Sequence, residues 1–337
     1  MSAQPSACPR IAVAGCGYWG RNLVRNFHAL GALVAVADPA ESGRRTATEL
    51  APTAAISADI AALFARPDID GIVLATPAVT HAPLGLAALA AGKHVFLEKP
   101  MALSLAEGVA LAGAARTAGR VLMVGHLLEY HPAFITLREQ VVPRLGRLTR
   151  LQSHRTNFGK VRTEEDAFWS LAPHDIAMIL RLAGRLPETV SCTGTHALGT
   201  ARADAAVALL RFGDGLDAHV FCSWIHPLKE QRLVAIGEHG AAVFDDTLRE
   251  NKLLWHDQHV AWTAGQPSLV RREPQPVPYP PEEPLRRECE AFLDAIALGR
   301  PPVTDAASSL RVMAVLESCS RSMAAGGAWQ AVAPLAP

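Results

Sequence analysis

The sequence predicts an α/β protein in two parts. The N-terminal part is a parallel sheet covered by helices, and the C-terminal part is an α+β domain with a large, mainly antiparallel open sheet. Three observations support this prediction. The chain has 337 residues, more than one ordinary domain holds. Short apolar runs alternate with helical segments up to about residue 125, and longer alternating segments with hairpin turns follow. We therefore expect domains at residues 1–125 and 126–337.

Five apolar runs in the first part predict strands, at 11–14, 32–37, 71–75, 94–97 and 121–124. Helical patterns between them cover 22–30, 56–64, 84–91 and 104–118, and Ser104 is suited to cap the last of these. The predicted strands are apolar throughout rather than alternating. Strands of that kind are typical of a parallel sheet buried on both faces.

The pattern changes after residue 125. A helix is predicted at 131–142, and strands at 205–212 and 216–225 flank the turn Gly213-Asp214-Gly215. Further strands are expected at 233–236, 242–244 and 253–256, a long proline-rich surface loop at 266–284, and closing helices at 286–298 and 305–323. The helices predicted in this part are too few to cover more than one face of its sheet. The other face must meet solvent, substrate or another subunit, and we expect a homo-oligomer, specifically a homotetramer.

Composition excludes several classes of protein. The 32 basic and 32 acidic residues balance, so nothing indicates a nucleic-acid partner. No apolar stretch is long enough to cross a membrane. The first nine residues resemble a short disordered tail rather than a signal peptide, which predicts a cytoplasmic protein. The six cysteines show no C-x-x-C pair and no zinc-site spacing, so we expect reduced thiols and no metal.

A glycine-rich turn follows the first predicted strand and opens the first helix. Gly15, Gly17 and Gly20 have the spacing G-x-G-x-x-G. Glycines there permit a tight turn, the approach of a pyrophosphate to the backbone, and close packing of helix on strand, while the helix N-terminus suits phosphates. This context predicts a Rossmann dinucleotide-binding domain, with Tyr18 and Trp19 as further cofactor contacts. A purely structural glycine turn is the alternative.

An acidic residue ends the second predicted strand. Asp38 lies 18 residues beyond Gly20, where a carboxylate accepts hydrogen bonds from the adenosine ribose. The same carboxylate repels a 2′-phosphate, which favours NAD over NADP. Arg44 and Arg45 are suited to bind that phosphate, so the alternative stays open at this point.

Two later strands also end in polar residues. The third leads into Thr76-Pro77, and the fourth into Glu98-Lys99-Pro100. Open α/β sheets bind ligands at the carboxyl ends of their strands, so these residues are expected at the cofactor. A simple turn explains the prolines equally well. It explains Lys99 only if that side chain points to solvent.

The ordered set AGCGYWG, ATPAVTH, EKP and VGHLLEYHP resembles the Gfo/Idh/MocA oxidoreductases, which include glucose–fructose oxidoreductase and inositol dehydrogenase. The resemblance covers nearly the whole chain. It implies that Lys99 of E-K-P lies beside the nicotinamide and the reacting hydroxyl. It also implies that His174 of LAPHDI, with Asp175 next to it, supplies the acid/base, and that NAD is the cofactor. Glu98 and His81 are expected at the cofactor or in the packing around it.

A second resemblance is narrower. GCGYWGRNLVRNFHALGAL and NFGKVRTEEDAFWSLAPHDIAMIL are similar to bacterial nucleotide-sugar 3-dehydrogenases. Those enzymes oxidise UDP-N-acetylglucosaminuronic acid at carbon 3, on the way to 2,3-diamino uronic acids of surface polysaccharides. The resemblance implies the same reaction here.

The second domain offers further candidates for substrate contact. His174 follows Pro173, which predicts a place at the start of a helix, where the helix dipole favours the neutral imidazole that a base requires. Lys160 and Arg162 are either an anion clamp for a uronate or diphosphate, or members of a solvated loop with weak surface ion pairs. Trp169 is either a wall of the sugar site or a core aromatic.

Two other functions remain open from the sequence. One is another sugar or polyol dehydrogenase, or a keto-sugar reductase, of the same family. The other is a dinucleotide-sensing regulator or assembly subunit without catalysis. Lys99 and His174 together argue against the second, because a sensor needs neither.

Overall fold

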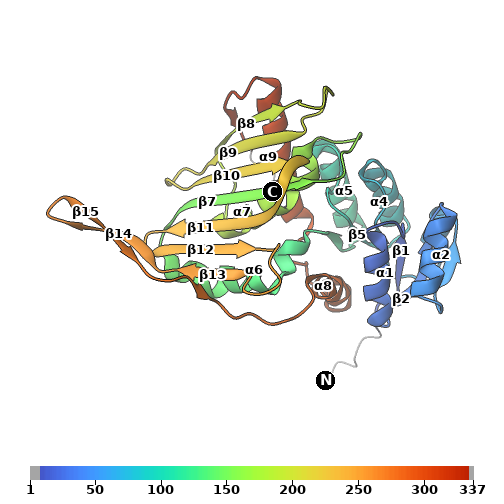
Figure 1. Ribbon diagram of the computed structural model, residues 1–337. Coiled ribbons are helices and arrows are strands. Elements are labelled where there is room, and N and C mark those ends of the chain that lie inside the picture. The colour runs from blue at the N-terminus through green and yellow to red at the C-terminus, as the bar shows by residue number, and fades with distance from the viewer. Residues whose placement is uncertain (1–7, 334–337) are drawn as a thin grey trace. The chain divides into compact units, whose positions relative to one another are not determined.

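The computed structural model describes residues 8–333 (Figure 1). Most of the tail predicted at residues 1–9 lies outside this range. By its internal contacts the chain forms two units. The first contains residues up to 130 together with 282–313, and the second contains 131–281 together with the residues from 314 on. The last stretch of the chain thus contributes to both units. The division into domains at residues 1–125 and 126–337 stays a prediction.

The first unit is built on a six-stranded parallel sheet in the order β3-β2-β1-β4-β5-β6. Its strands are β1 (Ile11–Ala14), β2 (Leu33–Ala37), β3 (Ala55–Ser57), β4 (Gly71–Leu74), β5 (His94–Leu97) and β6 (Leu122–Val124). The expected Rossmann sheet is confirmed, with one strand more than predicted. The helix expected at 56–64 is wrong, because the short, partly exposed strand β3 precedes a single turn, α3 (Ala61–Phe64).

Helices cover this sheet on both faces: α1 (Gly20–Ala29), α2 (Glu41–Leu50), α4 (His81–Ala90), α5 (Leu105–Ala118) and α8 (Pro284–Leu298), with short helical turns η1 (Ala78–Thr80) and η2 (Leu127–Tyr130). The predicted cap of α5 is confirmed, since the Ser104 hydroxyl accepts the backbone N–H of Glu107. Helix α8 lies late in the chain but packs on this sheet. The Phe292 ring contacts Phe27 and Phe96 edge-on, with ring centroids 6.5 and 5.6 Å apart.

The second unit is built on a nine-stranded sheet in the order β16-β13-β12-β11-β7-β10-β9-β8-β17. Its central strand β7 (Leu148–Phe158) pairs parallel with β10 (Asp217–Ser223), and the other neighbours are antiparallel. The mainly antiparallel sheet is therefore confirmed. The remaining strands are β8 (Thr189–Thr195), β9 (Ala205–Arg211), β11 (Ile225–Gly237), β12 (Gly240–Asp245), β13 (Leu253–His256), β16 (Gln275–Pro276) and β17 (Gln330–Ala331).

Two predictions in this unit need correction. Residues 266–271, expected as loop, form β15 (Gln266–Arg271), which pairs with β14 (Gln258–Thr263) in a hairpin that extends beyond the sheet (Figure 1). The helix expected at 131–142 is α6 (Pro132–Thr136) followed by a wider turn, η3 (Leu137–Val141), and then η4 (Val142–Leu145). Pro143 lies inside η4 and cannot donate a backbone hydrogen bond, so regular α-helix does not continue.

One face of the second sheet is covered by α7 (Ala167–Ala183) and by the end of α9 (Ala306–Ala324). A buried ion pair joins α7 to the sheet. The Asp175 carboxylate is fully buried, accepts from Arg155 Nε of β7 at 2.6 Å and Nη2 at 3.2 Å, and accepts from the Ser153 hydroxyl at 2.5 Å. Buried charges persist only when paired and hydrogen-bonded in this way.

We expect Asp175→Ala to lower the free energy of unfolding by about 3–5 kcal/mol, because it leaves the buried Arg155 guanidinium without its counter-charge. Urea unfolding followed by circular dichroism measures the change. Asp214→Ala is the control, since Asp214 pairs with Arg185 at the surface, where solvent screens the pair and the expected loss is small. Equal losses in the two variants would contradict this role of Asp175.

Candidate active site

The glycine turn after β1 has the geometry of a phosphate cradle. Gly15 has φ +93°, and a Cβ there would lie 2.7 Å from the carbonyl oxygen of Ala75. A Cβ on Gly20 would collide with the Gly15 carbonyl. Gly17 differs, since a Cβ there would meet no protein atom within 4 Å. Two glycines therefore allow close packing, and the third exposes backbone to an open space suited to a pyrophosphate.

The Asp38 carboxylate lies at the end of β2 and is 8% exposed. It accepts the backbone N–H of Cys16 at 2.7 Å and that of Ala40 at 2.8 Å. A carboxylate has about four acceptor positions, so some remain for ribose hydroxyls. Arg44 donates to the backbone carbonyls of Asp38 and Pro39, at 2.9 and 2.7 Å. Nη1 of its guanidinium is thereby engaged by the backbone at the end of β2.

The ends of β4 and β5 are tied together through a histidine. The His81 ring is 1% exposed, and its nitrogens lie 2.8 Å from the Pro100 carbonyl and 3.0 Å from the Thr76 carbonyl. The Thr76 hydroxyl accepts from Thr80 at 2.7 Å. This arrangement gives His81 a role in holding the two loops. Direct contacts of His81, Thr76 and Pro77 with the cofactor stay predictions.

Glu98 and Lys99 follow β5 on the same edge of the sheet. Trp19 Nε1 of the glycine turn donates to Glu98 Oε1 at 2.5 Å, and the Lys99 backbone N–H lies 3.3 Å from Glu98 Oε2. The Tyr18 side chain is 86% exposed. Burial raises the pKa of Glu98 to about 7, although the hydrogen bond from Trp19 and the charge of Lys99 oppose that rise. A carboxyl that titrates near neutral pH therefore lies beside Lys99.

In the second unit, His174 lies within α7, not at its start. The helix begins at Ala167, where the Asp166 carboxylate accepts the Trp169 backbone N–H at 2.9 Å, and Pro173 is inside it. The prediction that a helix N-terminus favours neutral His174 is therefore wrong. The first turn is the commonest place for proline in a helix, but Pro173 interrupts the hydrogen-bond ladder of a longer helix.

Of the other four substrate candidates, two make contacts inside the unit and two lie at its surface. Asp175 is held by Arg155, and the Trp169 indole, 9% exposed, donates to Ser320 at 2.8 Å. Lys160 is exposed, whereas Arg162 pairs with Glu165 at 3.2 Å. Of these four, only Lys160 and Arg162 lie on an exposed segment, so the structure does not gather all of them at one surface.

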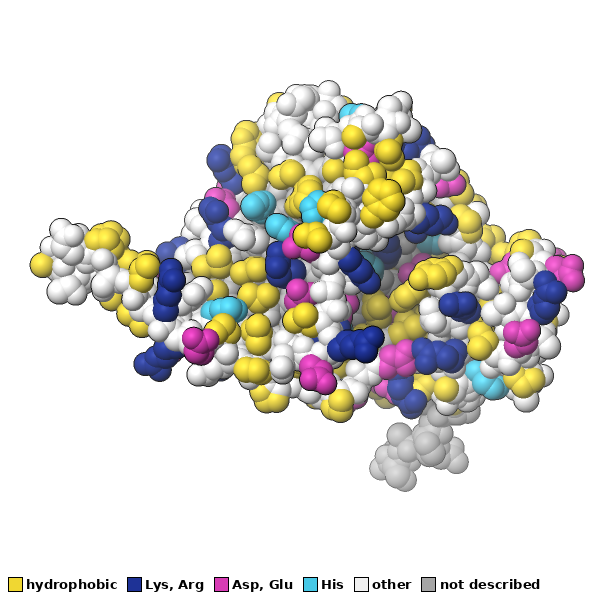
Figure 2. Space-filling model, in the orientation of Figure 1, with side chains coloured by type: hydrophobic (Ala, Val, Ile, Leu, Met, Phe, Trp, Pro, Cys, Tyr) yellow, Lys and Arg dark blue, Asp and Glu magenta, His cyan; other side chains and the backbone are white. Residues whose placement is uncertain are grey.

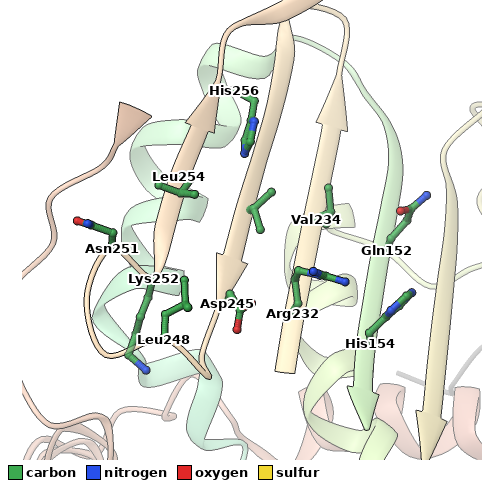
Figure 3. Close-up of a pocket in the computed structure, with 11 residues that line it drawn as sticks. Gln152, His154, Arg232, Val234, Asp245, Leu248, Asn251, Lys252, Leu254 and His256 are labelled. Carbon is green, nitrogen blue, oxygen red and sulfur yellow. The ribbon is translucent and has the colours of Figure 1, made fainter. Parts of the chain in front are cut away.

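The face of the second sheet opposite α7 carries a shallow hollow of about 390 Å³. Figure 3 shows side chains from β7, β11 and β13 projecting into it on the same side, with helices behind the strands. His154, Arg232 and Lys252 line it together with Val234 and Leu254. The basic groups are already engaged: Arg232 pairs with Glu230, and Lys252 with Asp246, both at 2.6 Å. Both of these cations are therefore already paired with carboxylates.

The sequence patterns did not single out one buried carboxyl of the first unit. Glu288 of α8 is fully buried, and neither of its carboxylate oxygens has a hydrogen-bond partner among residues 8–333. The signal was present, because Leu285, Cys289 and Phe292 mark the apolar stripe of α8 and Glu288 falls within it. Within the same range no group of three or more His, Cys, Asp or Glu side chains is suited to hold a metal, and no helix is long and apolar enough to cross a membrane.

The fold and the cradle define a dinucleotide-binding oxidoreductase. Residues 9–126 match the family model for oxidoreductases with an NAD-binding Rossmann fold, and residues 142–243 match the GFO/IDH/MocA C-terminal domain. The chain belongs to the GFO/IDH/MocA family and is an NAD-dependent oxidoreductase.

Two relatives, one of them also as a solved structure, are similar over nearly their whole length. UDP-N-acetylglucosamine 3-dehydrogenase of Acidithiobacillus ferrooxidans is 31% identical over 309 residues, covering 90% of this chain and 94% of that protein. A solved structure of UDP-N-acetylglucosamine 3-dehydrogenase from the same species has a TM-score of 0.81 and 28% identity, covering 95% of this chain and 99% of its own. Inositol 2-dehydrogenase 2 of Paenarthrobacter aurescens is 25% identical, covering 94% and 97%.

We expect NAD to be used at least about tenfold more efficiently than NADP, which corresponds to about 1.4 kcal/mol. The reason is the Asp38 carboxylate, which would repel a 2′-phosphate, while Nη1 of Arg44 donates to backbone carbonyls. Steady-state kcat/KM with both cofactors measures the preference. Asp38→Asn is expected to narrow it, and Arg45→Ala serves as the control on the exposed side of α2. Equal use of both cofactors by the wild type would refute the prediction.

Proposed function

We propose that the protein oxidises the carbon-3 hydroxyl of a UDP-linked N-acetylated sugar to a ketone, with NAD as oxidant. The observation that carries the proposal is the similarity to a UDP-N-acetylglucosamine 3-dehydrogenase over 90% of the chain. That similarity includes the second unit, where relatives of one fold usually differ when their substrates differ.

Two sugars are the candidates. The segment NFGKVRTEEDAFWSLAPHDI resembles enzymes of UDP-N-acetylglucosaminuronic acid, and we take this uronate as the first candidate, with polysaccharide biosynthesis as the context. The name of the Acidithiobacillus relative favours UDP-N-acetylglucosamine itself. Lys160 supports the uronate, because an exposed ammonium suits its carboxylate.

The proposed chemistry uses two side chains of this chain. His174 takes the hydroxyl proton as general base, and the Lys99 ammonium stabilises the oxygen as its charge develops. Bound NAD supplies the hydride acceptor. Trp169 and Asp175 act through packing, by holding α7 and thus the orientation of His174.

Two alternatives follow from other observations. The inositol dehydrogenase relative favours a free polyol as substrate. A non-catalytic dinucleotide sensor would keep the cradle alone, and it predicts no turnover with any alcohol.

The test of the function is a coupled assay. Oxidation of a secondary alcohol by NAD is unfavourable near neutral pH, so the ketone should be consumed by a PLP-dependent aminotransferase, with product analysis by mass spectrometry. We expect a 3-amino sugar from UDP-N-acetylglucosaminuronic acid or UDP-N-acetylglucosamine, and Lys160→Gln to lower efficiency about tenfold for the uronate only. Ready oxidation of free inositol, with no product from either nucleotide sugar, would refute the proposal.

We expect Lys99→Met and His174→Asn each to lower kcat by about 100-fold or more, as is typical of acid–base groups, with little change in NAD affinity. Single-turnover kinetics and cofactor titration separate the two effects. His196→Asn is the control, because that histidine is exposed in the same unit. A loss of kcat below about fivefold for His174→Asn would mean that another residue is the general base.

We propose that the uncovered face of the second sheet binds a second copy of the chain within a homotetramer. Figure 2 shows hydrophobic side chains mixed with histidines and basic groups over this face, and Val207 and Leu209 of β9 are 41% and 44% exposed there. We expect light scattering at micromolar concentration to give a tetramer mass, and Leu209→Glu to reduce it. Leu298→Glu at the end of α8 is the control, and a monomeric wild type would contradict the proposal.

A further inference from the structure

A β-hairpin projects from the second sheet and carries exposed apolar side chains. Its strands, β14 (Gln258–Thr263) and β15 (Gln266–Arg271), pair antiparallel and extend beyond the sheet (Figure 1). Trp262, Leu269 and Val260 are 69%, 66% and 48% exposed. Exposed apolar side chains that lie together mark interaction sites. The proposed reaction gives this hairpin no role.

The register of the hairpin places these side chains on one face. The two-residue turn at 264–265 has φ of 49° and 79°, a conformation that suits a tight hairpin. Val260 lies opposite Leu269, and Trp262 lies opposite Pro267. Directly opposed residues point to the same side, and so do residues two apart along a strand. These four residues therefore form one apolar face. The opposite face is mainly polar and includes His259, Thr263, Gln266 and Ser268.

A proline blunts the outer edge of β15. In a hairpin with a two-residue turn, the backbone N–H positions of the pair Trp262 and Pro267 point outward. Pro267 has no N–H, so another strand cannot continue a ladder along β15 at that point. A two-stranded hairpin is also only marginally stable by itself in water. The hairpin is therefore suited to bind through its apolar face rather than by adding a strand to β15.

The same unit contains a hollow that matches this face. The hollow of about 390 Å³ lies on the open side of the sheet (Figure 3), and pockets of about 300–1,000 Å³ commonly receive bound groups. Its apolar lining consists of Val234, Val243, Leu248 and Leu254. His256 also lines it and precedes the start of β14 by two residues. The hairpin extends away from the sheet and Trp262 is exposed, so Trp262 does not fill the hollow of its own chain.

The polar groups of the hollow suit an indole ring. Arg232 and Lys252 are each paired with a carboxylate at 2.6 Å, so an apolar group can cover them without leaving a charge unpaired. A guanidinium such as that of Arg232 binds favourably over the face of an indole. The Gln152 side chain in the lining offers an acceptor oxygen for the indole N–H, which needs a partner when buried.

The composition of the hairpin favours a protein partner over an anionic one. Arg271 is the one Lys or Arg between residues 258 and 271, and it lies at the base of the hairpin rather than at its tip. Binding to an anionic membrane or a nucleic acid depends on several cations. A second copy of this chain presents the hollow. Because each copy has both the hairpin and the hollow, a two-fold pair uses both surfaces twice.

We propose that the hairpin is an arm that binds a second copy of this chain, with Trp262 seated in the hollow of that copy. The hollow lies over β7 and β11–β13, whereas Val207 and Leu209 lie on β9, separated from β7 by β10. The arm therefore makes a contact distinct from the one proposed at β9. A tetramer built of two-fold pairs needs two different contacts. The inference rests on the proposed second copy at the open face and not on the substrate.

Disulfide trapping between two variants tests the contact. Cys8→Ser is the background, because Cys8 is exposed and the other five cysteines are buried. Trp262→Cys protein is mixed with Leu254→Cys protein under mild oxidation, and we expect a covalent dimer from the mixture but not from either variant alone. Ser268→Cys in place of Trp262→Cys is the matched control, since Ser268 lies on the opposite face of the same hairpin. Equal trapping by Ser268→Cys would overturn the proposal.

Light scattering over a range of concentrations measures what the arm contributes. We expect Trp262→Ser to raise the dissociation constant of one assembly step by about 30-fold or more, because tryptophans seated in pockets dominate many interfaces. His259→Ser on the polar face is the control and should keep the wild-type mass. Trp262 is exposed, so its replacement leaves the fold intact.

Each other outcome refutes the arm in a distinguishable way. A monomeric wild type would overturn both proposed contacts. An oligomer that Leu209→Glu dissociates but Trp262→Ser does not would refute the arm alone. Binding of the wild type to phosphatidylserine vesicles, lost in Trp262→Ser while the oligomer persists, would assign the hairpin to a membrane instead. The coupled assay with nucleotide sugars reports on the substrate separately, so an error there leaves these results unchanged.

Discussion

The hydrogen bonds to the Asp38 carboxylate are the constraint on which the cofactor edge depends. One oxygen accepts the N–H of Cys16 in the glycine turn, and the other accepts that of Ala40 before α2. Gly43 has no side chain because a Cβ would collide with this carboxylate. A single buried acid therefore holds the turn after β1 and the start of α2 in register, and its remaining lone pairs are available to a ribose hydroxyl. The residue predicted to select the cofactor also holds the glycine turn in place.

In the second unit, a buried ion pair likewise holds neighbouring elements in place. Asp175 and Arg155 fix α7 on β7 and β10, and the candidate base His174 is the neighbour of the buried acid. Because the helix cannot rotate without breaking a buried ion pair, the side chains next to Asp175 have a defined direction. Pro173 removes one backbone hydrogen bond from this helix, and the packing of its long buried face offsets that loss.

The charge required beside the nicotinamide differs before and after hydride transfer. A dehydrogenase must hold a cationic ring before hydride transfer and a neutral one afterwards, so a fixed negative charge nearby would suit only one of the two states. A carboxyl group that titrates near neutral pH suits both. Glu98 is suited to such a role because burial raises its pKa into the neutral range while Trp19 and Lys99 still support its ionised form.

The amino-acid sequence by itself determined the local features of this protein. The G-x-G-x-x-G turn, the acid at the end of β2 and the buried strands were predictable, because each depends on a few neighbouring residues whose spacing matches one secondary structure. Tertiary structure decided three other features. Helix α8 returns to the first sheet after more than a hundred residues of the second unit, and Pro173 lies inside a helix. Glu288 lies in a core without a hydrogen-bond partner among residues 8–333. None of these follows from local periodicity, because a helix shows which of its faces is apolar but not which distant surface that face will meet.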